Sequence, residues 1–313
     1  MWMIVASLLF AVMGVCVKKG SEDFTSAELV FWRGVISAVI LGVMARSQGI
    51  GLRTSHFKLH ASRSVVGSFS MAAWFYSLGF LPLAGAMTLN YLSSVWVALF
   101  LVGAGFVAYV SGVNGTGKGG EAGEGGETRM LVGQLALLAT VVAGFSGVVM
   151  ILKPSADPQA IVATLFGLLS GLLAAFCYLQ VVALSRVGEP EIRVVFYYAL
   201  ATAALGAIWM LFTGISTWRW SSSIWLLAIG VSAALAQLTL TKAYGASRSH
   251  VETLVVANLQ YCGILFAVLF GSVFFGEHVD AVGWAGIAVV VLSSIAATVI
   301  RDRMFPKAPV EEH

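Results

Sequence analysis

The stretch LVFWRGVISAVILGVMA, from Leu29 to Ala45, is apolar almost without interruption, yet it carries Arg33 within its first two turns. The hydrocarbon core of a membrane is about 30 Å thick, and a helix crosses it with roughly 20 mainly apolar residues. The stretch is therefore predicted to be a membrane-spanning helix. An arginine near the centre of such a helix costs roughly 2.5 to 3.5 kcal/mol on insertion scales, so Arg33 is expected to face protein or a wet cavity.

The rest of the chain has the same apolar character. Charged residues make up 11% of the 313 residues, against about 25% in soluble domains, and the mean hydropathy is +0.91. The long unbroken apolar runs exclude a transmembrane β-barrel, whose strands of about ten residues alternate apolar and polar side chains. We therefore predict an all-α membrane protein with ten transmembrane helices, near 2–17, 27–45, 64–81, 84–109, 130–152, 162–184, 192–214, 222–244, 252–274 and 280–300.

The distribution of basic residues predicts the orientation. If the N-terminus is cytoplasmic, thirteen of the seventeen Lys and Arg residues in loops and at helix ends lie on the cytoplasmic side, as the positive-inside rule requires. The first stretch shows no convincing cleavage site and is expected to be retained as a helix. The chain is thus predicted to be a multi-pass cell-membrane protein, in a bacterium of the cytoplasmic membrane, with both termini in the cytoplasm.

Residues 111–129 differ from the rest because they are rich in glycine and glutamate. Such a segment cannot build a hydrophobic core, so we expect a mobile cytoplasmic loop between the fourth and fifth helices. Its GTGKGG does not indicate a phosphate-binding loop, because the G-x-x-x-x-G-K-[ST] spacing is missing and no strand is expected before it.

The two halves of the chain resemble each other. LVFWRGVISA at 29–38 aligns with VVFYYALATA at 194–203, at an offset of 165 residues. WFYSLGFLPLAGAMTLNYLSSVW at 74–96 aligns with LTKAYGASRSHVETLVVANLQYC at 240–262 at a similar offset, with a register fixed only to one or two residues. The offset spans five helices, an odd number, so the halves are expected to insert in opposite orientations, as in the inverted repeats of many secondary transporters.

Several motifs resemble those of EamA-type transporters of the drug/metabolite transporter superfamily. They are Arg33, the FYSL at Phe75–Leu78, the short turn with Pro82, the FFGE at Phe274–Glu277 and the glycine-spaced WAGIAVVVLSS at 284–294. LHASRSVVGSFSMAAWFYSL further resembles the subset that includes bacterial S-adenosylmethionine and riboflavin carriers. The resemblance covers nearly the whole chain and implies ten helices in two five-helix halves, with a central cavity lined mainly by helices 1, 3, 4, 6, 8 and 9.

The resemblance also implies a domain organisation. Two features depart from the family pattern: the Gly-Glu that would close the fourth helix is replaced by the Gly/Glu-rich loop, and the proline usual midway along that helix is absent near Ser93 and Ser94. Both concern the gating geometry of the first half. The expected units are a first EamA repeat at 1–110 (helices 1–4), the loop at 111–129, helix 5 at 130–155, a second repeat at 160–301 (helices 6–10) and a cytoplasmic tail at 302–313.

Three charged side chains are candidates for gating or coupling. Arg33 is interpreted either as an anion-binding or gating charge, or as a packing arginine held by backbone carbonyls or by Glu28. Arg63, at the cytoplasmic start of the third helix, is interpreted as an interface anchor in preference to a site residue. Glu252, just inside the ninth helix, is the best-placed protonatable group, although the helix dipole also stabilises a glutamate there without any coupling role.

Uncharged polar and aromatic residues recur in the helices expected to line the cavity. Interhelical hydrogen bonds, worth roughly 0.6 kcal/mol each, would explain any one of them. Together they indicate a polar pocket with an aromatic wall near the midplane. The predicted substrate-binding residues are Trp74, Asn90, Ser94, Gln237, Asn258 and Tyr261.

These patterns predict a secondary transporter that moves a small polar or amphipathic metabolite by alternating access, with coupling to protons or exchange left open. The alternative is a channel or a non-transporting membrane scaffold. An enzyme is not expected, because no intramembrane aspartate pair or HExxH motif occurs, and no cofactor-binding or metal-ligand spacing is found. The expected partners are a small-molecule substrate and the lipid bilayer, with a homodimer as an option and no nucleic acid.

Overall fold

The computed structural model describes residues 1–97, 99–100, 136, 139–140, 142–147, 149–151, 157–247 and 250–304. Over this part of the chain the regular structure is helical, without β-strands, so the prediction of an all-α protein is confirmed there. The Gly/Glu-rich loop at 111–129, the end of the expected fourth helix, part of the expected fifth helix and the end of the tail lie outside the described residues.

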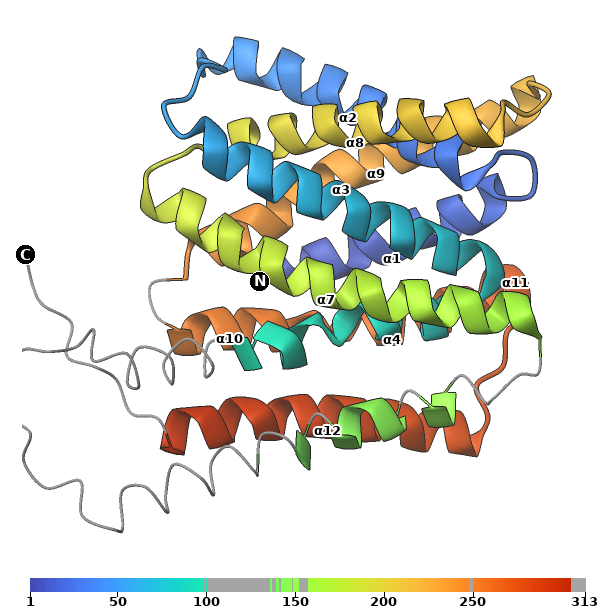
Figure 1. Cartoon of the computed structure of the whole chain (residues 1–313). Helices are drawn as coiled ribbons and strands as arrows, with labels where there is room; N and C mark the ends of the chain where they lie inside the picture. Colours follow the sequence, from blue (N-terminus) through green and yellow to red (C-terminus); the bar gives the residue numbers. More distant parts are fainter. Residues whose placement is uncertain are drawn as a thin grey trace, which may run out of the picture.

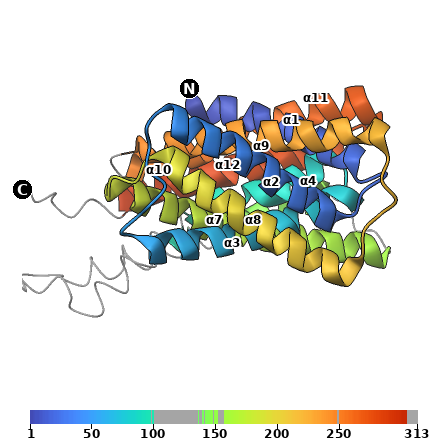
Figure 2. The same ribbon diagram turned by 90° about the horizontal axis from the view of Figure 1, so that it is seen from above.

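The helices form one bundle with their axes roughly along a common direction (Figures 1 and 2). Local sequence signals mark several helix starts: Thr25 and Glu28 form a capping box at α2, and Asp157 caps α7 with Pro158 at its first position. The described helices are α1 (Trp2–Gly20), α2 (Ser26–Ser47), α3 (Phe57–Phe80), α4 (Leu83–Tyr91), α7 (Pro158–Arg186), α8 (Glu191–Thr213), the short η1 (Trp220–Ser222), α9 (Ser223–Gly245), α10 (His250–Leu259), α11 (Cys262–Phe275) and α12 (Ala281–Met304).

Six helical segments in the described part of the chain are long and apolar enough to span a membrane. The protein is therefore a multi-pass membrane protein, since a helix satisfies its own backbone hydrogen bonds in lipid. The six segments are Trp2–Gly20, Ser26–Ser47, Pro158–Arg186, Glu191–Thr213, Trp220–Gly245 and Val255–Phe275.

The packing pairs helices from the two ends of the sequence. α2 lies along α8, α3 lies along α7, and α1 lies along α9. In Figure 1, α2 and α8 form one edge of the bundle and α12 forms the opposite edge, with α1, α3 and α9 between them. Side chains from α3, α8 and α9 therefore meet in the interior, far from one another in sequence.

Two glycines let α2 and α8 pack backbone against backbone. A Cβ atom added at Gly34 would lie 2.7 Å from Ala203 Cα and 2.8 Å from the carbonyl oxygen of Ala199. A Cβ atom added at Gly206 would lie 2.5 Å from the backbone nitrogen of Phe31. Small residues at such crossings are a general feature of membrane helices, whose association depends on close van der Waals contact.

Gly34→Ala is therefore expected to destabilise the protein, because the new methyl group meets backbone atoms that cannot rotate away. Overpacking of this kind costs about 1–3 kcal/mol of the free energy of unfolding. Thermal unfolding of the purified protein in detergent measures the effect. Gly51→Ala is the matched control, since a Cβ atom at Gly51 meets no atom within 4 Å. Equal melting temperatures for the two variants would show that the α2–α8 contact is looser than described.

Two helical stretches are interrupted partway. α4 ends at Tyr91, and residues around Leu92 make i→i+3 hydrogen bonds before the helix resumes; α10 and α11 are separated at Gln260 and Tyr261, where the same tightening occurs. The sequence predicted continuous helices over 84–109 and 252–274, so the interruptions are a difference from that expectation. Short tight turns inside membrane helices often mark hinges or sites.

Candidate functional site

Two buried arginines lie against the same tyrosine ring in the interior of the bundle. Arg33 of α2 and Arg63 of α3 are 1% and 2% exposed. Their guanidinium carbon atoms lie 4.9 Å and 4.3 Å from the centroid of the Tyr198 ring of α8. Gly67, one turn after Arg63, leaves the space for this contact, because a Cβ atom there would lie 2.9 Å from Tyr198 Cε2.

Hydrogen bonds fix part of this cluster. Arg63 Nη2 donates to Gln237 Oε1 of α9 at 3.3 Å, and the Tyr198 hydroxyl donates to the Gly67 carbonyl at 3.5 Å. The Nε and Nη1 atoms of both arginines have no hydrogen-bond partner, and neither arginine forms a salt bridge with any acidic side chain that the structure describes. We call Arg33, Arg63, Tyr198 and Gln237 the arginine cluster.

The structure excludes Glu28 as the partner of Arg33 and changes the expected position of Arg63. Glu28 does not hold Arg33, because its carboxylate accepts from Thr25 and from the backbone nitrogen and hydroxyl of Ser216. Arg33 also does not extend to the membrane surface, since it is almost fully buried. Arg63 was expected to be an interface anchor, and that expectation is wrong because its side chain turns inward onto Tyr198.

A second polar group surrounds a small cavity between α1, α3 and α4. The cavity has a volume of about 30 Å³ and is lined by Phe10, Ser70, Met71, Trp74, Asn90 and Tyr91. Asn90 Nδ2 donates to the hydroxyl of Ser170 at 3.0 Å, which joins α4 to α7. A cavity of this size holds water rather than a metabolite. Substrate binding here would therefore require the helices to separate.

The remaining predicted site residues lie at the interrupted helices or at a helix end. The hydroxyls of Ser94 and Tyr261 are hydrogen-bonded to each other, which links the α4 interruption to the one between α10 and α11. Asn258 is half-buried in α10 just before that interruption. Glu252 lies in the first turn of α10 and is exposed, unlike the buried side chains of the arginine cluster.

Sequence reasoning missed two members of the site. Tyr198 contacts both arginines, and Ser170 accepts a hydrogen bond from Asn90. A signal for Tyr198 existed, because the internal alignment at an offset of 165 residues places Tyr198 opposite Arg33. Residues that are equivalent in two repeats meet when both lie near the axis that relates the repeats. No comparable sequence signal pointed to Ser170.

One end of the bundle is tied together by a buried carboxylate, Glu189, in the turn between α7 and α8. It accepts a short hydrogen bond from Thr54 and lies 2.8 Å from Arg193 Nη1, 3.2 Å from His60 Nε2 and 3.3 Å from His56 Nδ1. Burial alone would raise the pKa of the Glu189 carboxyl, but these hydrogen bonds lower it more, to about 2 from an ordinary 4.5.

This carboxylate should make stability depend on pH. Because its folded pKa is depressed, its contribution is fully present above about pH 4.5 and is lost as the pH falls towards about 2. Glu189→Gln is therefore expected to lower the melting temperature by a few degrees at pH 7, with a difference from wild type that shrinks below pH 4.5. Thermal unfolding between pH 3 and pH 8 measures this. A difference in melting temperature that stays constant with pH would contradict the lowered pKa of Glu189.

The opposite end is tied by Lys18 and Glu277. Lys18 Nζ forms a short salt bridge with Glu277 Oε1 and donates to the Leu81 carbonyl at 3.0 Å. Glu277 Oε2 accepts from the backbone nitrogen of Leu83 at 2.9 Å. The carboxylate of the FFGE motif thus joins the end of α1 and the turn between α3 and α4 to the end of α11.

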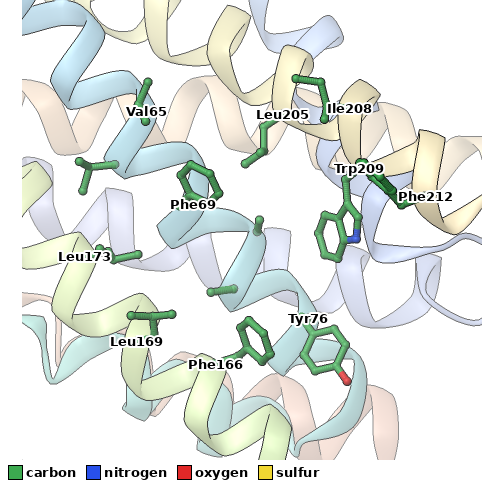
Figure 3. A pocket seen from close by; sticks show the side chains of 13 residues that line it. Val65, Phe69, Tyr76, Phe166, Leu169, Leu173, Leu205, Ile208, Trp209 and Phe212 are labelled. Atoms are coloured by element: carbon green, nitrogen blue, oxygen red, sulfur yellow. The ribbon is translucent and has the colours of Figure 1, made fainter.

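A larger groove opens on the side of the bundle between α3, α7 and α8 (Figure 3). Its volume is about 740 Å³, and its labelled lining is apolar and aromatic, including Phe69, Phe166 and Trp209. Phe69 and Phe166 are exposed at 54% and 40%, as expected for a surface that faces lipid. The groove contains none of the predicted site residues. Over the described residues, no group of three or more His, Cys, Asp or Glu could hold a metal ion.

Comparisons with known proteins place this architecture among membrane transporters. The sequence profile of the EamA-like transporter family matches residues 1–108. The pseudopaline exporter CntI of Pseudomonas aeruginosa is 32% identical over 297 residues, which cover 94% of this chain and 93% of that protein. A riboflavin transporter of Vibrio cholerae is 26% identical over 303 residues, covering 94% and 90% of the two chains.

A solved structure supports the same fold. A protein crystal structure that is 16% identical to this chain superposes with a TM-score of 0.63, covering 96% of this chain and 97% of the other. The relatives with known names are transporters, and they support a membrane transporter of the drug/metabolite type. The chain belongs to the EamA-type family of the drug/metabolite transporter superfamily.

Proposed function

We propose that this protein is a secondary transporter that moves a small polar or amphipathic metabolite by alternating access. The observation that carries the proposal is the arginine cluster. Two charged side chains from α2 and α3 are buried together with a tyrosine of α8 and an amide of α9. Ionisable residues inside a membrane protein are costly, and they mark substrate or ion pathways in most cases where they occur.

The proposed architecture has ten crossings in two inverted repeats, at 1–110 with 130–155 and at 160–301. Three relations support it. α1 lies along α9 as α7 lies along α3, and Arg33 meets its aligned counterpart Tyr198. The interruption after Tyr91 has a counterpart after Leu259, at a similar offset. Paired interrupted helices of this kind are typical of transporters with a midplane site.

The ties at the two ends support alternating access. At one end Glu189, in the turn after α7, bonds to Thr54, and at the other end Glu277, after α11, bonds to Lys18. In both cases the partners are far apart in sequence. In the proposed cycle, one tie opens while the other remains closed. The start of α1 and the end of α12 lie towards one end of the bundle (Figure 1), in agreement with both termini in the cytoplasm. The Glu189 tie would then close the cytoplasmic side.

The proposed substrate contacts are Trp74, Asn90, Ser94, Gln237, Asn258 and Tyr261, with Arg33 and Arg63 as charged site residues. Two of these contacts join separate helices through hydrogen bonds that a substrate could replace: Asn90 with Ser170, and Gln237 with Arg63. Glu252 is exposed at the start of α10, where it can exchange protons with water, so it remains the proposed coupling group.

Asn90→Ala and Gln237→Ala are expected to weaken substrate affinity about tenfold each while the protein level and fold persist, because each removes one hydrogen bond to substrate. The measurement is the concentration dependence of metabolite uptake into liposomes that contain the purified protein. Gln48→Ala, on an exposed residue after α2, is the matched control and should behave like wild type. If both site variants show wild-type affinity, these residues only hold helices together. Uptake that never saturates would favour a channel.

A further inference from the structure

The arginine cluster carries two positive charges whose balancing negative charge is missing from the described protein. Arginine side chains remain charged in proteins, and neither Arg33 nor Arg63 has a carboxylate partner among the residues that the structure describes. A cation–π contact with one tyrosine offsets only part of the burial cost, since such contacts are worth about 0.5–2 kcal/mol. Two like charges around one ring also repel each other.

The unpartnered donors indicate the chemistry that would balance these charges. Four buried nitrogen atoms, Nε and Nη1 of Arg33 and of Arg63, have no acceptor. A carboxylate has two oxygens with about four lone-pair sites and only accepts hydrogen bonds. Hydrogen bonds between a guanidinium and a carboxylate are roughly twice as strong as neutral ones. A monoanionic carboxylate also loses less hydration than a phosphate dianion on entering an apolar bundle.

We propose that Arg33 and Arg63 together bind the carboxylate end of an organic anion and that the transported metabolite is such an anion. Its substrate role rests on the transport function proposed above, whereas anion binding stands without it. Tyr198 contacts both guanidinium groups, and Gln237 orients Arg63 through its 3.3 Å hydrogen bond. The cluster thereby recognises the negative charge of the substrate, and the remaining polar residues recognise the other parts of that molecule.

The test uses small probes and the full purified chain in lipid nanodiscs. Thermal unfolding is followed while potassium acetate or succinate is added, with acetamide and succinamide as uncharged probes of the same shape. Potassium chloride and phosphate are the inorganic controls. A ligand that binds only the folded state raises the melting temperature with a saturable concentration dependence. We expect this response to acetate and succinate, and no response to the two amides or to chloride.

Variants link the response to the two arginines. Arg33→Gln and Arg63→Gln should each require at least about tenfold more acetate or succinate for the same shift. The concentration that Arg33→Lys requires should lie between those of Arg33→Gln and wild type, because a lysine keeps the charge but not the planar set of donors. Arg46→Gln, on an exposed residue in the last turn of α2, is the control and should respond like wild type.

Several outcomes would overturn the proposal. These are no shift with either carboxylate, an equal shift with the amides, a response to chloride or phosphate alone, and an undiminished response in the Arg33→Gln/Arg63→Gln double variant. Transport is scored separately in liposomes. Carboxylate binding without transport would leave the anion site standing and refute the transport function. Uptake of a neutral compound that is unaffected by both arginine variants would leave the transport function standing and refute the anion as its substrate.

Discussion

Arg33→Leu is expected to reduce metabolite uptake by about 100-fold or more while the protein still inserts into the membrane. Leucine makes α2 more apolar, so insertion is favoured. The loss of uptake follows because Arg33 would no longer donate two charged hydrogen bonds to the proposed anionic substrate, each worth about 1.5–3 kcal/mol. The measurement is mass spectrometry of compounds retained from a bacterial metabolite extract by liposomes that contain each variant. Arg33→Lys should restore only a small part of the uptake.

The thermal stability of the same variants separates a site residue from a packing residue. Removing an uncompensated buried charge is often neutral or stabilising. If Arg33 serves the substrate, Arg33→Leu should therefore unfold at the wild-type temperature or above it while uptake is lost. A variant that loses uptake only because it unfolds would instead show that Arg33 holds the packing. Normal uptake would contradict any role at the site.

A disulfide between α1 and α9 is expected to stop transport completely and reversibly. A Cβ atom at Gly20 would lie 3.7 Å from Trp225 Cβ, within the range of about 3.5–4.5 Å that disulfides require. The two residues belong to different proposed repeats. Rocking of one repeat against the other must change their separation, so the Gly20→Cys/Trp225→Cys bond should hold this end closed. Uptake is measured in oxidised liposomes and again after reduction, in a chain with Cys16, Cys177 and Cys262 replaced by alanine.

The matched control is a disulfide within one repeat at the same end of the bundle. A Cβ atom at Gly79 would lie 4.0 Å from Ser21 Cβ, and both residues belong to the first repeat. The Ser21→Cys/Gly79→Cys bond should leave uptake unchanged, because no relative motion of the repeats is needed between these two residues. Transport that persists in both oxidised pairs would argue against rocking of the repeats.

The sequence predicted those features that follow from local hydropathy and from the cost of burying polar groups. Arg33 was expected to avoid lipid because the charge is too costly there, and the structure buries it. Trp74 and Gln237 were expected inside the bundle, and both are buried. Whether these residues touch substrate stays a prediction, because burial alone also fits a purely structural role.

Features that depend on distant packing could not be predicted. Arg63 is buried only because Tyr198 and Gln237, more than 130 residues away in the chain, provide a ring and an amide for it. The interruptions after Tyr91 and Leu259 lack a proline that would have marked them locally. The groove of Figure 3 likewise forms from three helices whose neighbourhood no short sequence pattern reveals.

The central claim is that this chain is a carrier, and saturable uptake tests it most directly. A bacterial metabolite extract is placed on one side of the membrane of liposomes that contain the purified protein. The compounds that cross are identified by mass spectrometry and compared with those that cross the membrane of liposomes without protein. We predict a small set of compounds whose flux saturates with concentration and is competed by an excess of the same compound. No compound above the empty-liposome background, or a flux that rises linearly without competition, would contradict the account.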